Sequence, residues 1–151
     1  MPIGRNVQSL KAALDTQGAA AALAFLNAGV KHRYSAVYRL EGGKLKNVLL
    51  HDKADEMRPD FLAEVALETS FCQFVIRDGY FQTSDSGTDH RLDGHPYQGV
   101  MVSYHGVPIL SAGEIWGTLC HFDVLPQPLP DHEFELLRAA ATISPGFTAA
   151  A

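Results

Sequence analysis

Apolar residues follow helical spacing at the start of the chain and change to alternation near residue 34. Helical spacing runs through residues 7–14 and again through 20–26, and the second stretch closes at Gly29, a residue suited to a helix C-terminus. Residues 34–40 then alternate and are rich in β-forming types, and 45–51 return after a glycine-containing turn. The pattern predicts two helices followed by a β-hairpin.

The middle of the chain is less regular. Apolar positions predict a helix over 59–68, and an apolar run at 71–76 is closed by Asp78-Gly79. Residues 83–99 are rich in Ser, Asp and Gly, which predicts a long loop. Long loops in compact domains tend to bind ligands or cover sites, so this loop is a candidate for function.

A second pair of strands is predicted over 100–110 and 115–124, joined by a short turn. Three prolines within 126–130 make a stiff connector to a helix predicted over 131–143, which Pro145-Gly146 ends. Two hairpins with helices at both ends of the chain predict an α+β domain in which helices pack on an antiparallel sheet.

The composition narrows the class of protein. The 151 residues are about one domain's worth, and an apolar content of 46% is typical of a globular chain. The net charge of −5 disfavours nucleic acid or an anionic membrane as the main partner, because both need basic patches. No segment approaches the ~20 apolar residues of a membrane-spanning helix, and no signal peptide is visible. With two cysteines, Cys72 and Cys120, we expect free thiols and a cytoplasmic location.

Motifs in the second half of the chain resemble those of a known family. They are, in order, Thr69-Ser70-Phe71-Cys72, Asp78-Gly79-Tyr80-Phe81, Ser103-Tyr104-His105-Gly106-Val107-Pro108-Ile109-Leu110 and Gly117-Thr118-Leu119-Cys120-His121-Phe122-Asp123. Their order and spacing are similar to a bacterial GAF domain of the type with Ser-Phe-Cys, Tyr-x-Gly-Val-Pro-Leu and Gly-Thr-Leu-Cys-x-x-Asp segments. Ile109 stands where that pattern has leucine. The hairpin over 34–51 fits the first two strands of the same fold.

The resemblance implies a central antiparallel sheet with the N- and C-terminal helices on one face and a loop and helix segment over the other. It divides the chain into an N-terminal helix (1–16), the GAF domain (17–143) and a tail (144–151). GAF domains hold small ligands between the sheet and the crossing segment, which is 69–99 here. Because they often pair through their terminal helices, a homodimer is also expected.

Each ligand class known in the family leaves its own trace in a sequence. The cyclic-nucleotide pattern is echoed only superficially by residues 52–56, which we interpret as a polar loop. Bilin-attachment motifs are not evident around either cysteine. Four histidines lie in the half that would enclose a ligand, but the spacing of His90 and His95 is no metal signature. The resemblance therefore implies a small-molecule or redox sensor with an unknown cofactor and no metal site.

Two alternatives to a sensor stay open. One is the free methionine-R-sulfoxide reductase branch of the superfamily, whose chemistry needs an attacking thiolate and a resolving thiol. Cys72 and Cys120 are sufficient in number, but 78–99, in the segment where that branch mainly carries its cysteines, contains none. The other alternative is a dimerisation module without a ligand.

The candidate site combines apolar walls with a few placed polar groups, as small-molecule sites require. Strand alternation puts His121 on the opposite face of its strand from Cys120, and the sequence leaves open which face is the pocket. We predict no catalytic residue. The candidates for ligand contact are Phe71, Cys72, Phe74, Ser84, Asp85, His90, Tyr97, Tyr104, His105, Trp116 and Cys120.

Overall fold

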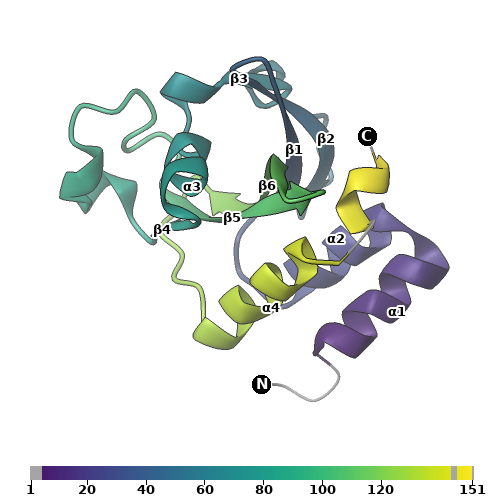
Figure 1. Cartoon of the computed structure of the whole chain (residues 1–151). Helices are drawn as coiled ribbons and strands as arrows, with labels where there is room; N and C mark the ends of the chain where they lie inside the picture. The colour runs from purple at the N-terminus through teal and green to yellow at the C-terminus, as the bar shows by residue number, and fades with distance from the viewer. Residues whose placement is uncertain (1–4, 144–145, 151) are drawn as a thin grey trace.

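The centre of the structure is an antiparallel sheet with the strand order β3-β2-β1-β6-β5-β4 (Figure 1). It is seen in a computed structural model that describes residues 5–143 and 146–150. The strands are β1 (Tyr34–Glu41), β2 (Lys44–Asp52), β3 (Glu64–Ala66), β4 (Phe81–Thr83), β5 (Ser103–Ser111) and β6 (Glu114–Asp123). The pairs β1–β2 and β5–β6 confirm both predicted hairpins.

Helices form a layer on each side of this sheet (Figure 1). One face is covered by α1 (Val7–Gln17), α2 (Ala19–Ala28) and α4 (Asp131–Ala141), and the other by α3 (Cys72–Asp78) with the loops around it. The predicted α+β layering is therefore confirmed. None of the helices in the described part of the chain is long and apolar enough to cross a membrane. Pro145, which was expected to end the last helix, lies outside the described residues.

The helix predicted over 59–68 is wrong. This stretch forms a 3-10 turn at Asp60–Leu62, the short strand β3, and a second 3-10 turn at Leu67–Thr69. The reason is the tertiary structure. Glu64–Ala66 pairs with the free side of β2 and forms the edge of the sheet, so its backbone bonds to the sheet instead of to itself. The apolar run at 71–76, which carried no assignment, contributes most of α3.

The sheet separates two buried cores. Leu119 of β6 packs with the helices α1, α2 and α4, whereas its neighbour Cys120 packs with α3 and the loops. Alternation along the strand sends successive side chains to opposite faces, so β1, β2, β5 and β6 contribute to both cores.

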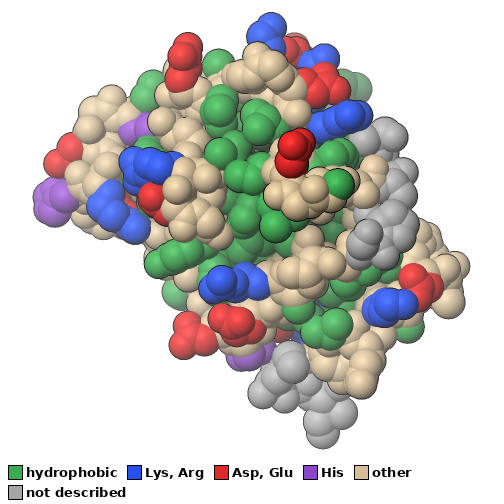
Figure 2. Space-filling view, in the orientation of Figure 1, with side chains coloured by type: hydrophobic (Ala, Val, Ile, Leu, Met, Phe, Trp, Pro, Cys, Tyr) green, Lys and Arg blue, Asp and Glu red, His purple; other side chains and the backbone are tan. Residues whose placement is uncertain are grey.

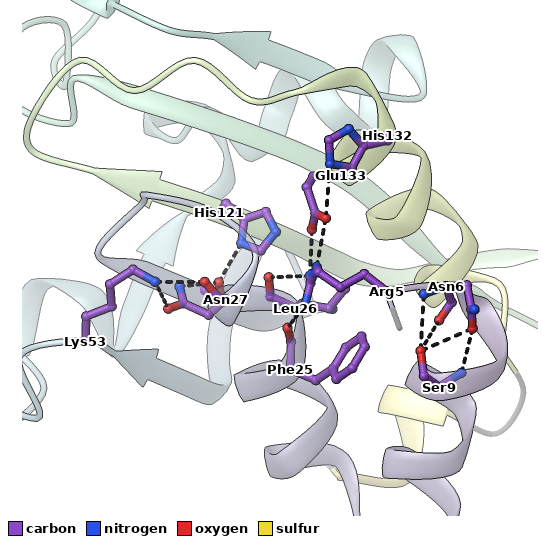
Figure 3. Close-up of polar contacts among 11 residues, drawn as sticks. Arg5, Asn6, Ser9, Phe25, Leu26, Asn27, Lys53, His121, His132 and Glu133 are labelled. Atoms are coloured by element: carbon purple, nitrogen blue, oxygen red, sulfur yellow. Dashed lines mark hydrogen bonds and ion pairs between the residues drawn. The ribbon is translucent and has the colours of Figure 1, made fainter. Parts of the chain in front are cut away.

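Arg5 ties the helical layer together. Its guanidinium forms two hydrogen bonds to the buried carboxylate of Glu133 in α4, at 2.6 and 2.9 Å (Figure 3). It also donates to the carbonyls of Phe25 and Leu26, which lie in the last turn of α2. One side chain thus satisfies carbonyls that a helix end leaves unpaired and neutralises a buried charge.

Candidate functional site

A cavity of about 60 Å³ lies between the sheet and the chain that crosses it, which we call the covering segment (residues 60–101). Figure 2 shows hydrophobic side chains gathered in the middle of this side of the molecule, between α3 and the β1–β2 hairpin, with charged side chains around them. The sheet contributes Tyr38, Leu45, Tyr104, Cys120 and Phe122 to the cavity wall. The covering segment contributes Phe61, Leu62, Val65, Ser70, Phe71, Cys72, Tyr97 and Met101.

The polar groups of the cavity meet around the hydroxyl of Tyr104. The ring of Tyr104 lies over Gly106, where a Cβ atom would stand only 2.6 Å from the tyrosine oxygen. That oxygen is 3.1 Å from the sulfur of Cys72, and the same sulfur is 3.4 Å from the hydroxyl of Thr118. A glycine at 106 therefore lets a strand residue reach the first turn of α3 and hold it against the sheet.

These groups are neutral in the folded protein. Burial raises the pKa of the Cys72 thiol and raises that of Cys120 well above its usual range. Burial also raises the pKa of Tyr38 and Tyr104 well above the ordinary tyrosine value. Desolvation disfavours each charged form, so both thiols are protonated at neutral pH and neither is an activated nucleophile.

A side-chain hydrogen bond adds to the β2–β3 pairing that holds the far end of the covering segment to the sheet. The hydroxyl of Tyr38 in β1 donates to the carbonyl of Leu62 at 2.8 Å, and both residues are buried. Nearby, the hydroxyl of Ser70 donates to the carbonyl of Leu67. The polar atoms of the wall thus bond within the protein, which allows an apolar cavity to exist without unpaired polar groups.

The structure brings together five of the residues that were candidates for ligand contact: Phe71, Cys72, Tyr97, Tyr104 and Cys120 line the cavity. Phe74 lies behind them, its ring centroid 4.8 Å from that of Phe81, beside a surface cleft.

The other candidates lie away from the cavity wall. Asp85 accepts a hydrogen bond from the amide of Gly87 and caps a 3-10 turn, and Ser84 and His90 are exposed on the same loop. His105 and Trp116 point to the helical side of the sheet, where Trp116 packs on the core formed with α1, α2 and α4. Strand alternation sends His105 there because Tyr104 faces the cavity, whereas Trp116 reaches that side through the register shift between Ile109 and Leu110.

Sequence reasoning missed the part of the wall that comes from β1, β2 and residues 61–65. Tyr38 shares a face of β1 with Ala36, and Phe122 shares a face of β6 with Cys120. Strand alternation shows which residues share a face. It identifies the residues of the cavity wall only once the face that holds the cavity is known for one strand.

A cluster of three histidines occupies the helical side of the same strands. The ring of His32 lies 5.0 Å from that of His105 and 5.9 Å from that of His121, between ring centroids. The hydroxyl of Ser35 is 2.5 Å from Nδ1 of His121, and Figure 3 shows His121 near the pair formed by Asn27 and Lys53. Among the described residues, neither nitrogen of His32 has a hydrogen-bond partner, nor has Nε2 of His121.

Burial sets the charge of these histidines. It lowers the pKa of His32 and of His105 to about 4. For His32, the proximity of His105 contributes to this lowering. It lowers the pKa of His121 well below the usual range. The imidazoles are therefore neutral at pH 7. Within residues 5–143 and 146–150, no three His, Cys, Asp or Glu side chains are arranged to hold a metal ion.

Solved structures share this fold at low sequence identity. A putative GAF sensor protein from Burkholderia vietnamiensis is 14% identical, with a TM-score of 0.71 over 95% of this chain and 92% of that one. A type II free methionine-R-sulfoxide reductase from Thermoplasma acidophilum is 19% identical, with a TM-score of 0.65 over 91% of each chain. The phycocyanobilin-bound GAF domain of a cyanobacterial phytochrome is 13% identical, with a TM-score of 0.66 over 89% and 87%.

At these identities the structural matches establish the fold alone, and no curated protein matches the chain. The family is established by sequence. A family model described as the GAF domain matches residues 7–143, nearly the whole chain, and the chain therefore belongs to the GAF domain family.

Proposed function

We propose that this GAF domain is a sensor module that binds a small molecule in the cavity between the sheet and the covering segment. The observation that carries the proposal is the cavity itself, which is concave, walled mainly by apolar and aromatic side chains, and supplied with a few hydroxyl and thiol groups. Small-molecule sites have this composition. The phytochrome domain of the same fold holds its phycocyanobilin, which supports the same use of the fold here.

The covering segment is the element that would report occupancy. It supplies more than half of the residues of the cavity wall. Besides the backbone pairing of Glu64–Ala66 with β2, its polar side-chain contacts to the sheet there are those of Leu62 with Tyr38 and of Cys72 with Tyr104 and Thr118. A ligand that binds one arrangement of the segment better than another shifts the population between them. Binding would therefore change the conformation of residues 60–101, and this change would be visible at the protein surface.

A reductase is the second candidate, because two sulfur atoms line the same cavity and reductases share the fold. Two features argue against it. Burial keeps both thiols protonated, whereas the reaction needs a thiolate. The cavity wall also lacks a charged side chain to hold a free amino acid. Thiol-dependent reduction of free methionine-R-sulfoxide that is lost in Cys72→Ser would restore this candidate.

Two further expectations belong to the proposal. We propose a homodimer through the terminal helices, for which the exposed Val7 on α1 offers apolar surface. We propose a reducing, cytoplasmic setting, which the free cysteines Cys72 and Cys120 support. Sedimentation velocity of wild type and Val7→Glu tests the first, since a charge in the interface would dissociate the dimer.

The ligand site is tested by thermal unfolding against a library of neutral, anionic and zwitterionic compounds. Val65 lies half-buried on the short edge strand β3 at the rim of the cavity, so Val65→Phe fills the space with little risk to the fold. Val124→Phe is the control, because Val124 is exposed directly after β6 and lies outside the cavity wall. We expect at least one compound to stabilise wild type and Val124→Phe but not Val65→Phe. Equal stabilisation of all three proteins would place binding elsewhere and refute the proposal.

A further inference from the structure

We propose that the cavity selects a neutral, mainly apolar molecule of a few non-hydrogen atoms and rejects anions and zwitterions. This inference rests on the proposed function, since it names the class of ligand for the same site. It separates this domain from a receptor for nucleotides or free amino acids, whose charges need partners inside the protein.

The first argument is charge. The cavity wall is built from aliphatic and aromatic side chains, two thiols and hydroxyl groups, without a carboxylate, ammonium, guanidinium or imidazole among its residues. The charged group that acts on the Tyr38 hydroxyl is Arg58, and its guanidinium is held at the surface by a hydrogen bond to Asn47. An ionised ligand would lose its hydration in the cavity and meet no counter-charge there.

The second argument is hydrogen bonding. Tyr38 and Ser70 give their protons to backbone carbonyls of the covering segment, and the hydroxyls of Tyr104 and Thr118 both bond to the sulfur of Cys72. The buried side-chain atoms without partners, counted over the described residues, belong to other side chains on the helical side of the sheet. The cavity therefore offers a ligand at most a shared hydroxyl or thiol, which suits a molecule with one weak polar group.

The third argument is size. The volume of about 60 Å³ is several times the ~10–15 Å³ that one water needs, and less than half of the ~150 Å³ cavity that holds benzene in an engineered lysozyme. The cavity therefore encloses a molecule of a few non-hydrogen atoms. A larger ligand would extend out of the cavity or displace the covering segment that lies over it.

A matched pair of compounds separates charge from shape. 2-Butanone and propionate have the same number of non-hydrogen atoms and nearly the same outline, but only propionate is an anion at pH 7. Each is titrated into isotopically labelled protein while amide resonances are followed by NMR. We expect 2-butanone to shift resonances of cavity residues such as Cys72, Tyr104 and Cys120. Propionate should bind at least about 100-fold more weakly, because a buried carboxylate without a partner is strongly disfavoured.

The position of the shifted resonances in wild type locates the site without any variant, and Val65→Phe with its control Val124→Phe then confirms it. If propionate shifts the cavity residues as strongly as 2-butanone and Val65→Phe abolishes both effects, the proposed ligand class is overturned while the cavity remains the ligand site. If neither compound shifts the cavity residues at millimolar concentration, the cavity is closed to small molecules, and the proposed function fails with this inference.

Discussion

Acidification is expected to unfold this domain through the histidines buried on the helical side of the sheet. The pKa of His32 and of His105 is about 4 in the folded protein, because burial disfavours the imidazolium, whereas the ordinary value is 6.5. The unfolded chain therefore binds these protons first as the pH falls. Their contribution to stability is complete above pH 6.5, declines between pH 6.5 and 4, and is lost below about pH 4.

The magnitude follows from that difference. At about 1.4 kcal/mol per pH unit, a shift from 6.5 to about 4 corresponds to about 3 kcal/mol for each histidine at low pH. The two together approach the whole stability of a typical domain, about 5–15 kcal/mol. Lys53 adds to the penalty for charging His32, and Asp123 opposes it.

The assay is urea unfolding between pH 4.5 and 8, followed by the fluorescence of Trp116, the single tryptophan. His32→Leu removes a titrating side chain whose nitrogens lack partners within the described structure, and it conserves volume. At pH 7.5 the variant should be at least as stable as wild type. The pH dependence of its unfolding free energy below pH 6.5 should become shallower by up to about 1.4 kcal/mol per pH unit, the weight of one proton.

His90→Gln is the control, because it removes an exposed imidazole from the loop that precedes β5. If His32→Leu and wild type lose stability with the same dependence on pH, His32 is not kept neutral by the fold. The account of the buried cluster given above would then be wrong.

Three substitutions test other contacts. Arg5→Met removes both hydrogen bonds of Arg5 to the buried carboxylate of Glu133 and leaves it, among the described residues, only His132, 3.6 Å away, so it should lower the free energy of unfolding in urea by about 3–5 kcal/mol; a loss below 1 kcal/mol would show that other groups replace the pair. Gly106→Ala places a methyl group on the hydroxyl of Tyr104 and should cost about 1–3 kcal/mol by the same assay, with a displaced tyrosine ring in a crystal structure. Tyr38→Phe should lower the free energy of unfolding by about 1–3 kcal/mol and speed amide hydrogen exchange in the covering segment. Unchanged exchange would show that the bond to Leu62 does not hold the segment to the sheet.

The strands and the terminal helices could be predicted from the sequence because their signals are local. Polar and apolar residues alternate in 34–40, a glycine-containing turn follows, and 45–51 return as a second strand. This pattern predicts a hairpin, and the structure has β1 and β2 there. The segment 59–68 could not be predicted in the same way. Its apolar spacing fits a helix, but the unpaired edge of β2 offers its backbone hydrogen bonds, and this depends on the assembled sheet.

The candidate site could be predicted only in part for a related reason. Aromatic and sulfur-containing residues of the crossing segment, such as Phe71 and Cys72, follow from composition and from the family resemblance. On the strands, alternation divides residues into two sets without saying which set meets the helices. Tyr104 and His105 lie on opposite faces by alternation, and both were reasonable candidates because only the packing of α2 and α4 on one side decides which face holds the cavity.

Although β5 and β6 border both the cavity and the histidine cluster, a ligand in the cavity should stabilise the domain without changing its response to acid. His105 and His121 are paired directly across the two strands, and the next pair, Gly106 and Cys120, borders the cavity. The pKa of each histidine is set by burial against the helices, which the cavity does not touch. A ligand such as 2-butanone should therefore add the same free energy, RT ln(1 + [L]/Kd), between pH 5 and 7 and move the acid midpoint downward without altering the slope above it. A slope that changes with ligand would mean that the ligand alters proton binding by the histidines, and hence that occupancy of the cavity is transmitted through the sheet to the helical layer.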